Sequence, residues 1–194
     1  MATRSESVDL VGDETATNLA RAALFAALVG AFAYVSFPFP LSPAPVTLQV
    51  LGVFLAGILL GPVWGGTALV LYLLAGALGA PVFSGGSAGL GVLLAEPTLG
   101  YLWSYPIAAA LVGWIVHRGV DLREPREAGL VTLVGAMAVG TVVIYAFGIA
   151  GMTFVLELTP AEAFLQGAAV FLPAEAAKMV AAVGIVRSDA IAAA

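Results

Sequence analysis

Glu175 and Lys178 place an acid and a base three residues apart within an otherwise apolar segment of the chain. In a helix this spacing puts both side chains on one face. A charge near the bilayer centre costs roughly 2.5 to 3.5 kcal/mol on insertion scales, so two such charges require a reason. If the pair faces a cavity, the carboxylate can accept hydrogen bonds from N–H groups and the ammonium can hold a carboxylate or a carbonyl. We therefore interpret the pair as part of a binding site for a small polar ligand.

A purely structural role for the pair is the alternative. Glu175 and Lys178 would then neutralise each other inside the bundle, or Lys178 would extend its ammonium to the cytoplasmic interface. Pro173 favours a site, because a proline within a helix kinks the axis and frees a carbonyl, although many transmembrane helices without a site also contain proline. The residues alone leave both interpretations open.

Further candidate ligand-binding residues lie near the ends of two other apolar segments. Gln49, close to Thr47, could offer donors and acceptors to a polar ligand or face the lipid headgroups. Tyr101 belongs to an aromatic cluster with Trp103 and Tyr105, which could stack on a ligand ring or form an interfacial belt. Both pairs of alternatives stay open at this point.

Gly86 and Ser87 lie in a glycine-rich stretch, residues 85–91. No Lys or Arg is near it, and no expected strand precedes it, as a nucleotide-binding fingerprint requires. We interpret the stretch as a mobile lid over the site. The chain also lacks a Walker A motif, so an ATP-driven step would need another polypeptide.

The composition indicates a membrane protein. Of 194 residues, 61% are hydrophobic and 10% are charged, whereas soluble domains carry roughly a quarter charged residues. A spanning helix needs about 20 predominantly apolar residues. The sequence therefore predicts an all-α integral protein of the cell membrane, a bundle of six transmembrane helices at about residues 18–37, 46–60, 64–80, 99–116, 130–156 and 163–186.

The spans divide the chain into three parts. Residues 1–17 form an acidic head that we expect to be flexible, residues 18–188 the transmembrane domain, and residues 189–194 a short tail. The head lacks the basic region of a secretory signal peptide, so we expect no cleavage. Prolines in 38–45 end the first helix, and Gly61-Pro62 predicts a tight turn that pairs spans two and three as a hairpin.

The basic residues set an orientation. In a six-span arrangement all those that flank the spans fall on one side, namely Arg4, Arg21, Arg118, Arg123, Arg126 and Arg187. By the positive-inside rule both termini and the 118–127 loop are cytoplasmic. Loops 38–45, 81–98 and 157–162 would then face outward.

The chain offers little for catalysis or metal binding. It has no cysteine and a single histidine, His117, which argues against zinc or iron sites. No nucleophile with a matching base is apparent, so we expect neither an enzyme nor a resident cofactor.

The first span carries two small-xxx-small pairs, Ala22 with Ala26 and Ala23 with Ala27, which permit close helix approach within the bundle or against a partner.

Several segments together resemble the BioY family, the biotin-specific substrate-binding components of energy-coupling factor transporters. The resemblance covers most of residues 20 to 186, and its most specific parts are residues 45–49, 60–62, 71–83, 85–91, 97–101 and 171–173 with the acid and Lys178 that follow. The family usually has aspartate where this chain has Glu175 and glycine where it has Ala174. The longer acid shifts the expected ligand contact by about one methylene.

The resemblance implies a six-helix bundle with a vitamin pocket near the outer face. Biotin would be captured from outside and imported by a partner membrane subunit and two cytoplasmic ATPase subunits, with small residues of the first helix at the contact. The expected ligand-binding residues are Glu175, Lys178, Tyr101, Gln49, Thr47, Gly86 and Ser87, and the end of biotin that each meets is open. A component for another vitamin, a channel and a small multi-span membrane enzyme are the competing hypotheses.

Overall fold

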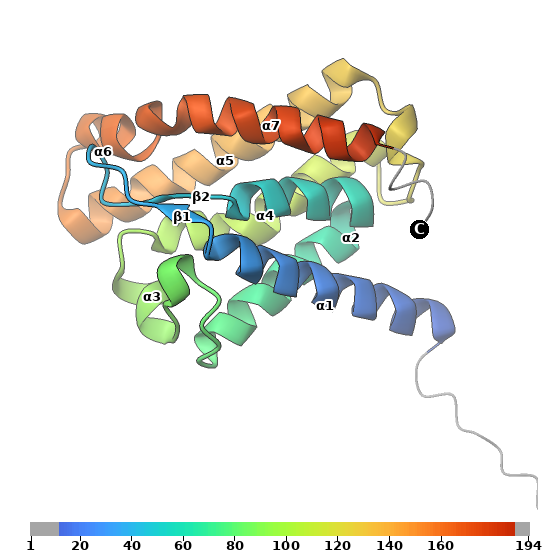
Figure 1. Ribbon diagram of the computed structural model, residues 1–194, viewed down its shortest axis with the longest axis horizontal. Helices are drawn as coiled ribbons and strands as arrows, with labels where there is room; N and C mark the ends of the chain where they lie inside the picture. The colour runs from blue at the N-terminus through green and yellow to red at the C-terminus, as the bar shows by residue number, and fades with distance from the viewer. Residues whose placement is uncertain (1–11, 189–194) are drawn as a thin grey trace, which may run out of the picture.

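Long apolar helices dominate the computed structural model, which describes residues 12–188 (Figure 1). The helices are α1 (Asp13–Ala33), α2 (Gln49–Ala77), α3 (Leu90–Ala95), α4 (Leu99–His117), α5 (Leu130–Leu156), α6 (Pro160–Gly167) and α7 (Leu172–Arg187). Helices α1, α2, α4 and α5, and the stretch Pro160–Arg187 that contains α6 and α7, are long and apolar enough to cross a membrane. The prediction of a helical membrane bundle is confirmed.

Helix α2 is a hairpin of two helical segments rather than one straight helix. Its backbone breaks at Gly61, with φ 75° and ψ −177°, a conformation that favours glycine, and Pro62 follows. A Cβ added to Gly65 would lie 2.8 Å from the Ala56 carbonyl oxygen. In a straight helix these residues would be about 13 Å apart at 1.5 Å per residue. Residues 49–60 and 62–77 therefore run back along each other, as predicted, and bring the helical membrane segments within residues 12–188 to six.

The N-terminal boundary differs from the prediction. Helix α1 begins at Asp13, so residues 13–17, which were assigned to the flexible head, are helical. Asp13 and Glu14 occupy the first turn, where carboxylates interact favourably with the helix dipole. Residues 1–11 of the predicted head and the tail 189–194 lie outside the described residues.

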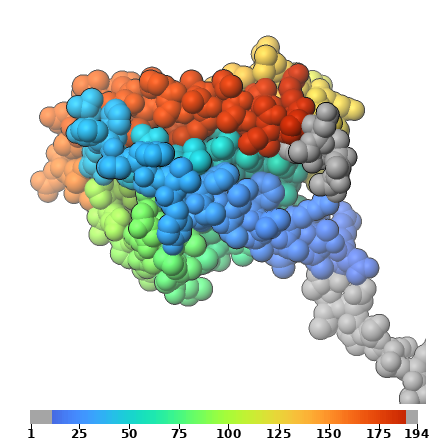
Figure 2. All heavy atoms as spheres, viewed as in Figure 1, coloured from blue at the N-terminus to red at the C-terminus, as the bar shows by residue number. Residues whose placement is uncertain are grey.

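A short antiparallel ladder, absent from the all-α prediction, closes the loop after α1. Strand β1 (Ser36–Phe37) pairs with β2 (Val46–Thr47) in the register Ser36↔Thr47 and Phe37↔Val46. The proline-rich connection between the strands, residues 38–45, contains a turn in which the Ser42 N–H donates to the Phe39 carbonyl at 3.0 Å. Figure 2 shows this segment, in light blue, packed against the orange α6–α7 region, where the rings of Phe39 and Phe171 lie 6.1 Å apart.

The glycine-rich segment after α2 is anchored by an aromatic ring. Phe83 is buried against Gly76, whose missing Cβ leaves room for the ring. The Gly89 N–H donates a 2.7 Å hydrogen bond to the Gly76 carbonyl. A 3₁₀ turn (Ser84–Gly86) and α3 follow Phe83, so the predicted irregular loop contains helical turns.

The opposite end of the bundle is tied together by polar contacts. The backbone N–H of Arg123 donates to His117 Nδ1 at 2.9 Å, and His117 Nε2 lies 3.0 Å from the Ile58 carbonyl oxygen. Because Nδ1 accepts, Nε2 carries the proton and donates. Arg187 Nη2 also donates to the Ala128 carbonyl at 3.4 Å. The loop of residues 118–127 is thereby held against the α2 turn and the end of α7.

Glycine permits the close packing of α2 on α4. A Cβ on Gly113 would lie 2.6 Å from the Gly61 carbonyl carbon and from the Pro62 nitrogen, both of which are backbone atoms that cannot rotate away. By contrast, a Cβ on the exposed Gly135 of α5 would meet nothing within 4 Å. The two positions form a matched pair for testing this contact.

We expect Gly113→Ala to destabilise the protein by about 1 to 3 kcal/mol, because overpacking forces the two backbones apart. Thermal unfolding in detergent should show a lower Tm than the native protein. Gly135→Ala is the control and should leave Tm unchanged or raise it, since alanine favours helix. Equal Tm values for the two variants would contradict the proposed contact.

Candidate functional site

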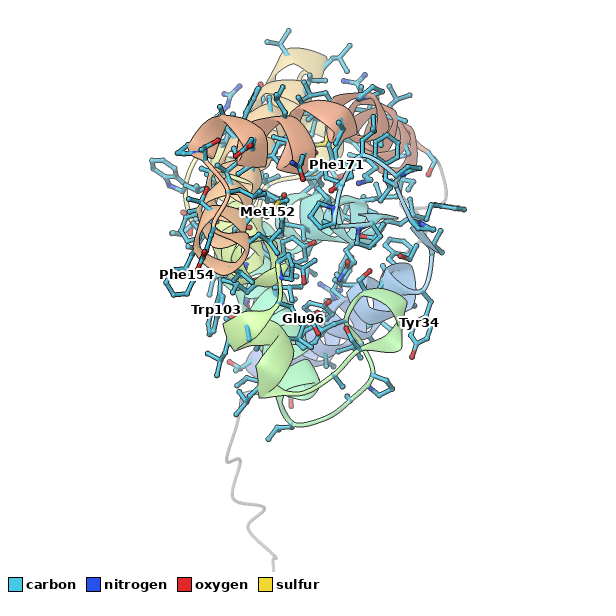
Figure 3. All side chains as sticks on the ribbon, turned by 90° about the vertical axis from the view of Figure 1, so that its left-hand side faces the viewer. Tyr34, Glu96, Trp103, Met152, Phe154 and Phe171 are labelled. Carbon is cyan, nitrogen blue, oxygen red and sulfur yellow. The ribbon has the colours of Figure 1, made fainter. Side chains whose placement is uncertain are left out.

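A cavity opens at the end of the bundle away from the arginine cluster. It lies between the start of α2, the start of α4, the second half of α5 and the start of α7, and encloses about 550 Å³ of empty space including its opening. Figure 3 looks onto this end and labels Phe171, one of its lining residues. The lining residues are Ala44, Pro45, Val46, Thr47, Gln49, Val50, Ser84, Thr98, Tyr101, Leu102, Tyr105, Ile144, Tyr145, Phe171, Glu175 and Lys178.

Glu175 and Lys178 face this cavity from one side of α7. Lys178 Nζ lies 2.6 Å from Glu175 Oε1, and the two residues are 6% and 4% exposed. Lys178 is therefore a buried, paired ammonium rather than one extended to the interface. The other carboxylate oxygen, Glu175 Oε2, is buried and accepts no hydrogen bond from the described residues. The pair thus has unused polar capacity inside the cavity.

Pro173 plays a different part from the one predicted. The chain breaks between α6 and α7 at residues 168–171, and Pro173 lies in the first turn of α7. A proline there costs no hydrogen bond, because the first N–H groups of a helix have no partner within it. The prediction that Pro173 kinks a continuous span is wrong. Instead it helps to start the helix, with Glu175 in the first turn, where a carboxylate is favoured, and Lys178 about one turn after Glu175.

Thr47 and Gln49 form a buried polar chain at the cavity wall. Thr47 Oγ1 donates to Gln49 Oε1 at 2.8 Å, and Gln49 Nε2 donates to the Tyr72 hydroxyl at 2.5 Å. Gln49 is buried and does not face the headgroups. Its amide retains one N–H and one lone pair for a further partner.

The aromatic cluster of α4 divides between the cavity and the outside. Tyr101 and Tyr105 line the cavity, and the Tyr101 hydroxyl donates to the Gly167 carbonyl at 2.6 Å. That bond commits its hydroxyl to the bundle, so Tyr101 offers the cavity mainly its ring. Trp103 points elsewhere, with Nε1 donating to the Leu93 carbonyl at 2.8 Å.

The glycine-rich segment contributes through a different residue from those predicted. Ser84 lines the cavity, whereas Gly86 and Ser87 do not. Gly86 packs against the ring of Tyr34, and the Ser87 hydroxyl donates to the Ser84 carbonyl at 3.1 Å. The turn directs Gly86 and Ser87 away from the cavity, so their part in ligand binding, as a lid that closes over the site, stays a prediction.

Tyr145 and Phe171 are lining residues that sequence reasoning missed. Tyr145 lies in the long apolar α5 with no charged neighbour along the chain, so nothing in the local sequence signals it. Its ring meets that of Tyr101 edge to face, with centroids 6.4 Å apart. Phe171 immediately precedes α7 and belongs to residues 171–173, one of the segments that resemble the BioY family. Both side chains contribute apolar surface to the cavity that contains the Glu175–Lys178 pair.

The small residues of α1 lie on two faces. Ala22 is 0% exposed inside the bundle, and Ala26 is partly buried against the core. Ala23 and Ala27 are exposed. Adjacent helical positions differ by about 100°, so one i,i+4 pair faces inward while the next faces outward. The prediction that Ala22 contacts a partner is wrong, and Ala23 and Ala27 are the pair left to do so.

Comparisons with known proteins agree on one family. The model of the BioY family matches residues 3–193. The biotin transporter BioY of Rhizobium etli is 39% identical over 171 residues, 85% of this chain and 88% of that protein. The biotin transporter BioY of Thermotoga maritima is 38% identical over 136 residues, 70% and 74% of the two chains. The crystal structure of an S-component for biotin from an ECF-type ABC transporter matches with TM-score 0.80 and 23% identity, covering 92% and 93% of the two chains, which shows a shared fold.

The buried ion pair yields a stability prediction for the ligand-free protein. We expect Lys178→Met to lower stability by about 3 to 5 kcal/mol, because it leaves the Glu175 carboxylate buried without its counter-charge. The double variant Glu175→Gln with Lys178→Met removes both charges and should recover most of the lost Tm. Thermal unfolding of the three proteins in detergent measures this. A double variant no more stable than the single one would contradict the charge explanation.

Proposed function

Because the chain belongs to the BioY family, we propose that it is the membrane subunit that captures biotin from outside and delivers it for ATP-driven import. It is a multi-pass membrane protein of a transporter family, and its relatives bear the names of transporters rather than enzymes. The observation that carries the proposal is the buried Glu175–Lys178 pair facing a cavity with aromatic walls.

The cavity suits the chemistry of biotin. Biotin combines an apolar bicyclic core with a ureido group and a carboxylate tail, and such ligands need apolar walls with a few placed polar groups. Tyr101, Tyr105 and Phe171 supply the walls. Glu175 and Lys178 supply an acceptor and donors at one side, and Gln49 with Thr47 supplies an amide and a hydroxyl at another. We propose that these residues bind the ligand.

The proposed orientation places this cavity at the outer face. The arginines of the 118–127 loop and Arg187 lie at the other end of the bundle, and basic flanks favour the cytoplasm. Both termini would then be cytoplasmic. The binding domain runs from α1 to α7, and residues 81–89 with the β1–β2 loop would form the cover of the cavity.

Import would require partner subunits. The sequence carries no Walker A motif, so we propose that a transmembrane coupling subunit and cytoplasmic ATPase subunits supply the driving force. The exposed pair Ala23 and Ala27 on α1 suits such a partner, because small side chains let helix backbones approach closely. No resident cofactor is part of this proposal.

We expect the purified protein in detergent to bind labelled biotin saturably, and Lys178→Met to weaken that binding at least about a hundredfold, because a buried charged hydrogen bond and its counter-charge are lost. Equilibrium binding measures both. Arg21→Ala, an exposed basic residue of α1, is the control and should bind like the native protein. Binding of another vitamin in place of biotin would overturn the ligand, and conduction or turnover without a retained ligand would overturn the function.

We expect Ala23→Trp with Ala27→Trp to abolish co-purification with a co-expressed coupling subunit while biotin binding stays native. Two indoles on that face would hold a partner helix several ångströms away. The control is Ala146→Trp with Ala150→Trp, an exposed i,i+4 alanine pair on α5. Loss of assembly in the control alone would place the partner on α5 instead.

A further inference from the structure

An apolar groove opens on the outside of the bundle, between the start of α5 and α7 (Figure 1). It holds about 790 Å³ of empty space including its opening. All six lining residues are apolar, namely Leu130, Val134, Ala176, Met179, Val180 and Val183. The hydrocarbon core of a membrane supplies no water to fill such a groove. Its occupant in the membrane is therefore apolar over this length.

The groove ends at a basic side chain. Val183 lies one turn before Arg187, the exposed last residue of α7, so the two side chains share one face of the helix. Arg187 Nη2 donates to the carbonyl oxygen of Ala128, two residues before Leu130, at 3.4 Å. A guanidinium carries five N–H donors, and within the described residues this is the one hydrogen bond that the Arg187 side chain makes. The remaining donors are available to an anion at the end of the groove.

The acidic side chains of the neighbouring loop leave this positive charge unpaired. Glu124 and Glu127 line a separate hollow, together with Arg118 and Arg123. Within residues 12–188 the one printed ion pair is that of Glu175 with Lys178, on another face of α7, so no carboxylate there pairs with Arg187. The groove thus combines an apolar trough with a cation at the end of the bundle that carries the 118–127 loop.

The walls of the groove suit a flexible chain better than a helix. Transmembrane helices approach each other closely through small residues, as the exposed Ala23 and Ala27 of α1 would allow, whereas one of the six lining residues here, Ala176, is small. Branched side chains and the adaptable Met179 form an irregular surface that an acyl chain can follow. Basic pockets between transmembrane helices bind anionic lipid headgroups.

We propose that this groove binds one anionic phospholipid from the leaflet on the side of the 118–127 loop. An acyl chain lies along Val180 and Val183, and the phosphate accepts charged hydrogen bonds from Arg187. The lipid site is separate from the ligand cavity, because Glu175 and Lys178 face the cavity from a different side of α7. It goes beyond the proposed function and does not depend on which ligand the cavity takes.

The test uses the full chain, freed of lipid in detergent and titrated with phosphatidylglycerol or with phosphatidylcholine of the same acyl chains. A ligand of the folded protein raises Tm with its concentration. Phosphatidylglycerol should act at concentrations about fivefold lower, the attraction of one arginine for anionic lipid. Arg187→Gln should abolish this preference, and Val180→Trp should weaken both lipids, because the indole fills the groove. The matched controls are Arg118→Gln, at the same end, and Val142→Trp, exposed on α5 outside the groove; both should respond like the native protein.

Four outcomes would overturn the lipid site. Equal responses to the two lipids in the native protein, or a preference lost equally in Arg118→Gln, would leave only diffuse attraction. A native response in Val180→Trp would remove the acyl chain from the groove. Sodium phosphate that reproduces the effect of phosphatidylglycerol would make Arg187 part of a soluble anion site. A change from dimer to monomer in Val180→Trp, measured by light scattering, would assign the groove to a second copy of the chain.

Discussion

The hydrocarbon core of a membrane offers polar groups no partner, so each polar group at that depth must find one within the protein or its ligand. The bundle meets this constraint at separate places: Lys178 with Glu175 on α7, Gln49 with Thr47 and Tyr72 near the start of α2, and His117 with backbone groups at the other end. Two of these networks, on α7 and at the start of α2, line the same cavity, and the Gln49 amide there keeps one N–H and one lone pair for a further partner. Spare hydrogen-bonding capacity inside a membrane bundle suits a polar ligand.

The positions of these networks depend on glycine. Helices α2, α4 and α5 approach each other closely where side chains are absent, and the ring of Tyr101 lies against Gly148 of α5. The Tyr101 hydroxyl donates to the carbonyl of Gly167, the last residue of α6. Tyr101 thus links three elements around the cavity. Its position is fixed by backbone contacts, so the cavity wall it forms is set by the packing of the bundle.

Much of this arrangement could be predicted because membrane segments follow simple rules. Hydropathy located the spans, Gly61-Pro62 located the α2 hairpin, and the three-residue spacing of Glu175 and Lys178 placed both on one face. The positions that could not be predicted from the sequence have physical explanations. The inward or outward face of Ala22 and the direction of Gly86 depend on tertiary packing that composition does not encode. The position of Tyr145 in the cavity wall could not be predicted, because an aromatic residue in an apolar helix resembles any other core residue in sequence.

The first segment of the α2 hairpin is shorter than the hydrocarbon core of a membrane is thick. Residues 49–60 form a helix about 18 Å long at 1.5 Å per residue, whereas the hydrocarbon core is about 30 Å thick. The start of this helix, at Gln49, lines the cavity, so the remaining depth above it belongs to the cavity and its cover. Under the proposed orientation and function, a ligand seated beside Gln49 would already have crossed part of the bilayer. The step left to a coupling partner would then be correspondingly short, and bilayer thickness would change its length.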